Sequence, residues 1–307
     1  MEARKKHPLR GIIILLIATV IWGLAYIAQS DAMQHLGPIA FNCIRITLGG
    51  LVLIPAIPVF HHFDPEYRLL DLNQRRKKRN ISLIGGVVCG AFLCAAAAFQ
   101  QIGISTTSAG KSGFLTALYI VLVPIFGILF RKRASWIALA GVLLALIGSY
   151  FLCVKQGTSF TIEQGDWMLM LDAVMFAFQI LFIDFFLERG GDSIWMTCVE
   201  FLFAGVIQIP YMLIAEPASW SAILAAGPAI LYAGLASGAV GYTLQMLGQR
   251  ELEPTGASLL MSLESVFAAL FGWLLLGQQM SGRELIGCGL VFAAVIISQI
   301  PMKKRSR

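Results

Sequence analysis

The sequence predicts an all-α integral membrane protein with ten transmembrane helices in two inverted five-helix repeats. Three observations support this fold class: the composition, a series of long apolar runs, and a match between the two halves of the chain. Hydrophobic residues make up 58% of the 307 residues and charged residues only 13%, whereas soluble domains carry about 25% charged residues. The main solvent of this chain is therefore lipid.

Ten apolar runs are each long enough to cross, as a helix, a hydrocarbon core about 30 Å thick. Lipid does not tolerate unpaired backbone groups, and the runs are continuous rather than alternating, which favours helices over a closed barrel. The two longest runs must tilt or contain a break. The predicted spans are 11–30, 37–60, 81–102, 107–130, 135–154, 166–187, 193–214, 222–249, 254–277 and 281–301.

The basic residues predict that both termini lie in the cytoplasm, because Lys and Arg stay on the inner side of a membrane. With the N-terminus inside, Lys and Arg fall in inner segments, apart from Arg45 within a span and Lys111, Lys155 and Arg283 outside. The net charge of +6 is then explained by orientation and contact with anionic lipid heads, and no nucleic-acid partner is expected. The first run is too long for a signal peptide and is predicted to be an uncleaved helix.

Cysteine and histidine positions disfavour metal and nucleophile chemistry. All six cysteines fall inside spans without zinc-ligand or CxxC spacing, and all four histidines fall outside the apolar runs. Buried cysteines at such positions are small packing residues. The sequence also lacks HExxH, GxSxG, Walker-type and GxGxxG motifs. We therefore expect no enzyme activity, no metal and no cofactor.

An internal match divides the chain into two halves. The stretches CIRITLGGLVLIP (43–55) and CVEFLFAGVIQIP (198–210) align without a gap, 155 residues apart. The third and fourth spans match the eighth and ninth at an offset of 145, and the last span of each half matches through a glycine. Because each half holds five spans, an odd number, the second half enters the membrane from the opposite face, as in many secondary transporters. The predicted repeats are residues 1–155 and 156–307.

Six pieces of the sequence form a recognisable set: Trp22-Gly23, Arg45, TTSAGKSGFLTALYIVLVP (106–124), GDWMLMLDAVMFAFQI (165–180), SLESVFAALFGWLLLG (262–277) and IGCGL (286–290). Together they resemble the EamA family of the drug/metabolite transporter (DMT) superfamily, and the resemblance covers essentially the whole chain. In two places the chain departs from many relatives: Ser265 stands where they carry proline, and Gln278 where they carry glutamate. Neither departure changes the expected fold.

The resemblance implies a basket of ten helices around a central cavity lined by helices 1–4 and 6–9, with helices 5 and 10 at the edge. It implies a secondary active transporter of small metabolites, namely amino acids, related compounds or drugs, which many relatives move outward. The expected mechanism is alternating access around a site at mid-depth. The expected location is the plasma membrane of a bacterium. The alternative is a channel or facilitator without ion coupling. A surface on helices 5 and 10 would serve a homodimer if the protein is not a monomer.

Glu264 is the first candidate site residue. It lies ten residues after Pro254, where the ninth span begins, so it is about 15 Å deep and close to the midplane. A charge there costs at least about 2.5–3.5 kcal/mol on insertion scales. Its mate in the first repeat, Tyr119, is also near mid-depth. We predict that both line the central site, where Glu264 binds a substrate amine or carries a coupling proton. Alternatively, a neutral glutamate holds two helices together.

Arg45 and Glu200 are repeat mates of opposite charge, each seven residues into its helix. They enter from opposite faces, so about 10 Å of depth separates them and direct pairing is not expected. A site role and a structural role are open for both.

The remaining candidates are polar or aromatic side chains within the spans. Gln100 and Gln245 line a vestibule or pack at the interfaces, and Lys111 attracts an anion or reaches the outer surface. Asp172 and Gln179 on the sixth span are further candidates for the cavity. Trp22 and Tyr26, four residues apart, form an aromatic wall or pack in the core. The candidate substrate-binding residues are Glu264, Tyr119, Arg45, Glu200, Gln100, Gln245, Lys111, Gln179, Trp22 and Tyr26.

Overall fold

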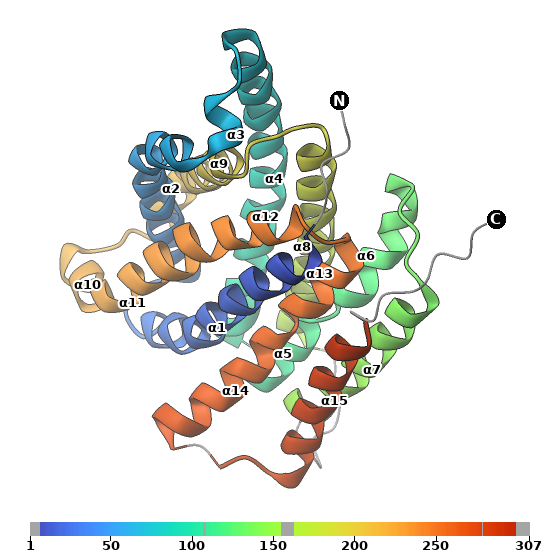
Figure 1. Ribbon diagram of the computed structural model, residues 1–307. Helices are drawn as coiled ribbons and strands as arrows, with labels where there is room; N and C mark the ends of the chain where they lie inside the picture. Colours follow the sequence, from blue (N-terminus) through green and yellow to red (C-terminus); the bar gives the residue numbers. More distant parts are fainter. Residues whose placement is uncertain (1–6, 107–108, 155–162, 278, 299–307) are drawn as a thin grey trace.

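The computed structural model describes residues 7–106, 109–154, 163–277 and 279–298, and the regular structure within them is helical (Figure 1). The first half contains α1 (Pro8–Ala32), α2 (Pro38–Phe63), α3 (Pro65–Arg68), α4 (Leu72–Thr106), α5 (Ala109–Thr116), α6 (Tyr119–Gly127), a 3-10 turn η1 (Ile128–Phe130) and α7 (Trp136–Cys153). The second half contains α8 (Gln164–Glu188), α9 (Ser193–Ala215), α10 (Trp220–Ala225), α11 (Gly227–Leu231), a π-helix η2 (Tyr232–Tyr242), α12 (Thr243–Gln249), α13 (Pro254–Met261), α14 (Leu263–Leu276) and α15 (Gly282–Ser298).

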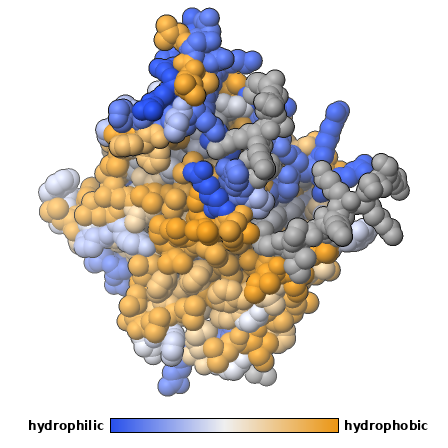
Figure 2. All heavy atoms as spheres, in the orientation of Figure 1, coloured by the Kyte–Doolittle hydropathy of each residue, from blue (hydrophilic) through white to orange (hydrophobic). Residues whose placement is uncertain are grey.

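The predicted fold class is confirmed. Within the described residues, nine helical segments are long and apolar enough to cross a membrane, and α15, with 17 residues, is the tenth. Side chains such as Ile84, Leu143 and Ile296 are more than half exposed, as expected of surfaces that face lipid. Figure 2 shows these surfaces as a hydrophobic belt across the molecule, with hydrophilic residues above it over α3 and the start of α4.

One boundary differs clearly from the prediction. The third span was expected to begin at residue 81, but α4 begins at Leu72 and α2 continues to Phe63. The basic run 75–79 is therefore helical, because Arg and Lys are good helix formers and α4 continues past the apolar segment. The connection between these helices is thus a short, ordered helical hairpin rather than a long polar loop.

The crossing of α2 with α9 shows the two-fold relation between the repeats. A Cβ atom on Gly50 would lie 2.9 Å from the backbone nitrogen of Leu202, and a Cβ on Gly205 would lie 2.9 Å from the backbone nitrogen of Thr47. Both pairs of positions, Gly50 with Gly205 and Thr47 with Leu202, are 155 residues apart. The two contacts are therefore copies of one another, and each glycine permits backbone approach that a side chain would block.

A second pair of contacts extends the repeat to the first helix of each half. A Cβ on Gly248 would lie 2.6 Å from Cγ of Leu15, and a Cβ on Gly103 would lie 2.5 Å from Cγ of Leu169. Gly103 and Gly248 are mates at the offset of 145, so Leu15 and Leu169, which are 154 residues apart, are mates as well. Thus α1 corresponds to α8, a relation that the sequence match had not included.

The fourth and ninth spans are broken at equivalent places. Helices α5 and α6 are separated at Ala117 and Leu118, and α13 and α14 at Ser262, which is 145 residues after Ala117. The hydroxyl of Ser262 donates to the carbonyl oxygen of Leu259 at 2.7 Å, and that of Ser265 to the carbonyl oxygen of Ser262 at 2.8 Å. Such bonds satisfy backbone groups that a broken helix leaves free.

The end of the bundle where α1 begins and α15 ends, here called the termini end, joins the two repeats through charged side chains. Asp192, which caps α9, lies 3.2 Å from Nε2 of His61 and 3.6 Å from Nζ of Lys78. Its backbone nitrogen donates to the Ser82 hydroxyl at 2.8 Å. Burial would raise the pKa of Asp192, but the hydrogen bond with His61 and the charge of Lys78 outweigh it and hold the pKa below its ordinary value.

Substitution of Asp192 by Asn is expected to lower the free energy of unfolding by about 1–3 kcal/mol, the usual cost of a buried charged group's lost hydrogen bond. Since the folded pKa is lowered, the carboxylate stabilises the fold at pH values above its ordinary pKa. That contribution is lost only as the pH falls through the folded pKa. Thermal unfolding in detergent at pH 7 and pH 3 checks this: the gap between wild type and Asp192→Asn should narrow at the lower pH. A gap of equal size at both values would contradict it.

Candidate functional site

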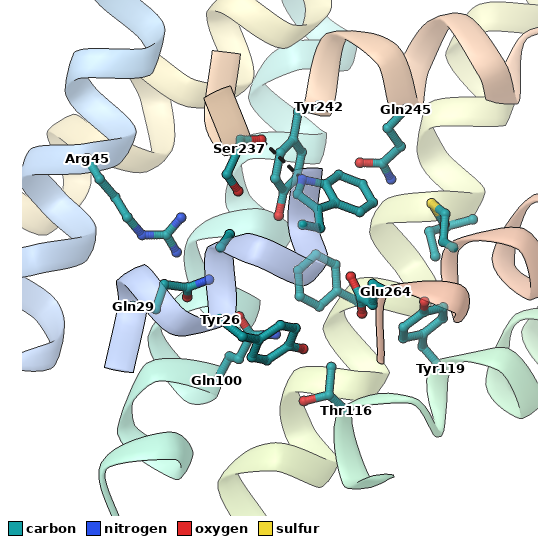
Figure 3. Close-up of a pocket in the computed structure, with 15 residues that line it drawn as sticks. Tyr26, Gln29, Arg45, Gln100, Thr116, Tyr119, Ser237, Tyr242, Gln245 and Glu264 are labelled. Carbon is teal, nitrogen blue, oxygen red and sulfur yellow. Dashed lines mark hydrogen bonds between the residues drawn. The ribbon is translucent and has the colours of Figure 1, made fainter. Parts of the chain in front are cut away.

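A cavity lies between the two repeats, with about 580 Å³ of space that atoms do not fill when the open solvent at its mouth is included. Helices of both halves contribute to its wall, and the two broken spans deliver residues to it directly at their breaks. Figure 3 shows its polar side chains converging from several helices. The lining residues are Trp22, Ala25, Tyr26, Gln29, Arg45, Gln100, Thr116, Tyr119, Phe176, Ile180, Ser237, Tyr242, Gln245, Met261 and Glu264.

Most of the candidates from the sequence line this cavity, and three do not. Glu200 and Gln179 are fully buried beside it. Lys111 belongs to α5, but its side chain lies outside the described part of the chain. The candidates that line the cavity are Glu264, Tyr119, Arg45, Gln100, Gln245, Trp22 and Tyr26.

Glu264 and Tyr119 occupy equivalent positions just after the two helix breaks. Tyr119 is the first residue of α6, and Glu264 the second residue of α14. Within the described residues, no hydrogen bond or ion pair joins the Glu264 carboxylate to another side chain. A carboxylate that only holds two helices together would have such a bond. Glu264 therefore presents a free acceptor to the cavity.

Arg45 reaches the same space from α2. Its Nε donates to Oδ1 of Asn42 at 2.8 Å, and its guanidinium lies 5.5 Å from the ring centroid of Phe41. These contacts fix the stem and leave the terminal nitrogens directed into the cavity, near Gln29 (Figure 3). The Arg45 guanidinium and the Glu264 carboxylate enter from opposite sides, so the cavity has a positive wall and a negative wall.

Aromatic rings fill the wall between these two charges. Trp22 Nε1 donates to the carbonyl oxygen of Ser237 at 3.1 Å, and the Trp22 ring meets the ring of Tyr242 edge to face, with centroids 5.3 Å apart. The ring of Tyr119 lies 6.5 Å from that of Phe176. Such a wall offers apolar contact and ring faces to a ligand that carries a cation.

Four polar lining residues were not among the sequence candidates: Gln29, Thr116, Ser237 and Tyr242. Gln29 follows Tyr26 by three residues, and Thr116 precedes Tyr119 by three. These spacings place each pair on one helix face. Tyr242 likewise precedes Gln245 by three residues. A search for polar residues three positions from each candidate would therefore have found Gln29, Thr116 and Tyr242, but not Ser237.

Asp172 lies behind the cavity wall on α8 and is fully buried. Its Oδ2 accepts a hydrogen bond from the Thr116 hydroxyl at 2.9 Å and a weaker one from Nε2 of Gln100 at 3.5 Å. Both donors line the cavity. Asp172 therefore orients two polar wall residues without lining the space itself.

A buried chain of amide hydrogen bonds leads away from the cavity wall. Gln245 Nε2 donates to Oε1 of Gln179 at 3.2 Å, and Gln179 Nε2 donates to Oε1 of Glu200 at 2.7 Å. Among the described residues, Oε2 of Glu200 has no hydrogen-bond partner. Arg45 and Glu200 form no ion pair there, in line with the depth argument. Glu200 thus lies beside the cavity, in a closed part of the protein.

Comparison with known proteins gives consistent similarities over the full chain. Residues 9–154 and 163–299 match the EamA-like transporter family. An "Uncharacterized transporter" of Archaeoglobus fulgidus is 26% identical, over 92% of this chain and 83% of the relative. The "Uncharacterized inner membrane transporter YicL" of Salmonella typhimurium is 25% identical, over 97% and 98%.

Two further similarities bear on ligand and fold. The "S-adenosylmethionine/S-adenosylhomocysteine transporter" of Chlamydia muridarum is 23% identical, over 92% of this chain and 91% of its own. A crystal structure with a TM-score of 0.75 and 18% identity covers 96% of this chain and 98% of that chain. At that identity the crystal structure shows a shared fold and no more.

Proposed function

The chain belongs to the EamA-like transporter family, and we propose that it is a secondary active transporter that works by alternating access. As a member, it is a multi-pass membrane transporter of small molecules and not an enzyme. The observation that best supports the mechanism is a polar cavity at mid-depth between inverted repeats, where secondary transporters hold their substrates.

We propose that the substrate is a small metabolite with an amine, such as an amino acid, a related compound or a cationic drug. Its amine would lie against Glu264 and a carboxylate, if it has one, against Arg45. The aromatic residues would contact its apolar part. S-adenosylmethionine, which the printed name of the Chlamydia muridarum relative mentions, carries an amine and a carboxylate and belongs in the test panel.

We also propose how the protein is oriented in the membrane and in which direction it transports. The basic residues favour a cytoplasmic termini end, and the inner membrane relative of Salmonella typhimurium favours the plasma membrane of a bacterium. The cavity-lining residues on α1, α2 and α4 lie in the halves of these helices away from the termini end, whereas Gln245 and Met261 lie nearer to it. We propose that the cavity faces outward and that the protein exports its substrate, with protons as the coupling ion. The repeat boundary at 155 and a monomeric or homodimeric state are proposed as well.

A channel or uncoupled facilitator is the second candidate. It needs a polar path across the whole membrane. Between the cavity and the termini end, however, the described chain packs apolar side chains such as Ile120, Val123 and Leu260, all fully buried. This apolar packing favours a carrier that closes on one side.

Uptake into liposomes tests the proposal. Purified protein is reconstituted and given labelled amino acids, S-adenosylmethionine and cationic drugs, with and without an imposed pH gradient, beside empty liposomes. We expect at least one compound to accumulate above its external concentration when the gradient is present. Equilibration without accumulation would favour the facilitator, and transport that ignores the gradient would remove proton coupling.

A further inference from the structure

The cavity wall contains five pairs of repeat mates. Three pairs are related by the offset of 145 and two by the offset of 154 that links α1 to α8. Residues that line the cavity together with their mates lie about the pseudo-two-fold axis and belong to the central site. These pairs are Gln100 with Gln245, Thr116 with Met261, Tyr119 with Glu264, Trp22 with Phe176, and Tyr26 with Ile180.

The other five lining residues have mates that do not line the cavity. Arg45 corresponds to Glu200 at the offset of 155 that links α2 to α9, and Gln29 to Ile183 at the offset of 154. Both of these mates are fully buried. The remaining pairs are Ala25 with Gln179, Ser237 with Phe92, and Tyr242 with Ala97. The wall is therefore symmetric at its centre and asymmetric toward the end opposite the termini.

This asymmetry identifies the residues that would line the opposite state. In a transporter with inverted repeats, the two halves exchange conformations when the open side changes. We infer that in the state open at the termini end Glu200 takes the place of Arg45 in the cavity wall, so that a wall with one acid and one base becomes a wall with two acids.

The surroundings of Glu200 fit this role. The carboxylate is fully buried, yet a chain of side-chain amides connects it through Gln179 to Gln245 in the cavity wall. In the described part of the chain, no Lys or Arg lies within 4.0 Å of it, and its Oε2 has no partner. Glu200 thus has an acceptor available for a ligand once the packing around it opens.

The exchange of Arg45 for Glu200 determines which class of ligand the site binds at each face of the membrane. This inference rests on the proposed alternating access. At the termini end the ligand meets two acids, Glu200 and Glu264, which bind an organic cation. At the opposite end it meets Glu264 with Arg45, which weakens the hold on a net positive ligand. A net cationic amine is therefore bound at the termini end and released at the other.

Charged thiol reagents test the exchange at positions other than the two charged residues themselves. Gln29→Cys and Ile183→Cys, at mated positions, are treated in sealed vesicles of known orientation. The reagents are methanethiosulfonates bearing trimethylammonium or sulfonate, and mass spectrometry of each peptide separates these sites from the six native cysteines. Thr197→Cys on α9 is the control, because its mate, Asn42, does not line the cavity.

We expect Ile183→Cys to react at least tenfold faster from the termini end than from the other side, and Gln29→Cys the reverse. Relative to a free thiol, the cationic reagent should be favoured at Ile183→Cys, and this preference should fall at least fivefold when Glu200→Gln is added. The anionic reagent should be favoured at Gln29→Cys, and Thr197→Cys should stay unreactive.

Two results would overturn the inference while leaving the transporter intact: Ile183→Cys unreactive from the termini end in vesicles that accumulate substrate, or a cationic preference unchanged by Glu200→Gln. Failure of the proposed function has a different pattern. In that case Gln29→Cys would react equally from both sides, and no compound would accumulate.

Discussion

Replacing Glu264 with Gln should reduce substrate uptake into liposomes by about 10- to 100-fold and leave thermal unfolding nearly unchanged. The size follows from a hydrogen bond to a charged group, which contributes about 1.5–3 kcal/mol, with 1.4 kcal/mol equal to a factor of ten. Unfolding should change little because no partner is stranded: among the described residues the Glu264 carboxylate accepts no hydrogen bond. Uptake and unfolding are measured on the same preparation.

Glu188→Gln is the matched control, since it makes the same chemical change at an exposed carboxylate that pairs with Lys132 at the termini end. Its uptake should equal that of the wild type. If Glu264→Gln transports normally, the residue has no part in binding or coupling, and Arg45 becomes the first residue to test. If it unfolds at a much lower temperature, Glu264 has a structural role instead.

The positions of Glu264 and Tyr119 were predictable from depth and repeat alone. Each follows a recognisable helix start by a countable number of residues, and a 1.5 Å rise per residue then fixes its depth. The number of spans and their inverted arrangement followed in the same way, from composition and from the odd number of spans in each half.

The closure of the cavity on one side could not be predicted in that way. Arg45 and Glu200 look equivalent in sequence, because they are mates at equal distances from opposite faces, but one lines the cavity and the other is fully buried. On the proposed alternating access, which mate faces the cavity depends on the conformational state and not on either residue. The sequence would then encode both states, whereas the structure shows one arrangement.

The contacts of Ser82 and Lys78 with Asp192 were also beyond the sequence. The segment 61–80 looked like a polar insertion, and helix propensity alone did not indicate what it would meet. Its partners come from the second repeat, more than 100 residues away along the chain. Only the packed structure shows that this hairpin ties the two halves together at the termini end.

Replacing Gly205 with Val should lower the free energy of unfolding by about 3 kcal/mol, the upper part of the usual range for overpacking. The added Cβ would lie 2.9 Å from the backbone nitrogen of Thr47 and 3.0 Å from its Cα. Backbone atoms cannot rotate away as a side chain does, so α2 and α9 must separate. Since Gly50 makes the equivalent contact with Leu202, Gly50→Val should cost a similar amount.

Gly289→Val is the control for this pair, because Gly289 lies within α15 and a Cβ there would meet nothing within 4 Å. Its unfolding temperature in detergent, followed by tryptophan fluorescence, should match that of the wild type. Equal losses of stability at positions 50 and 205 would mean that the two equivalent contacts at the crossing of α2 and α9 stabilise the protein to the same extent. A loss at only one of them would mean that the repeats have diverged in packing, and the exchange of conformations argued for Arg45 and Glu200 would lose its structural basis.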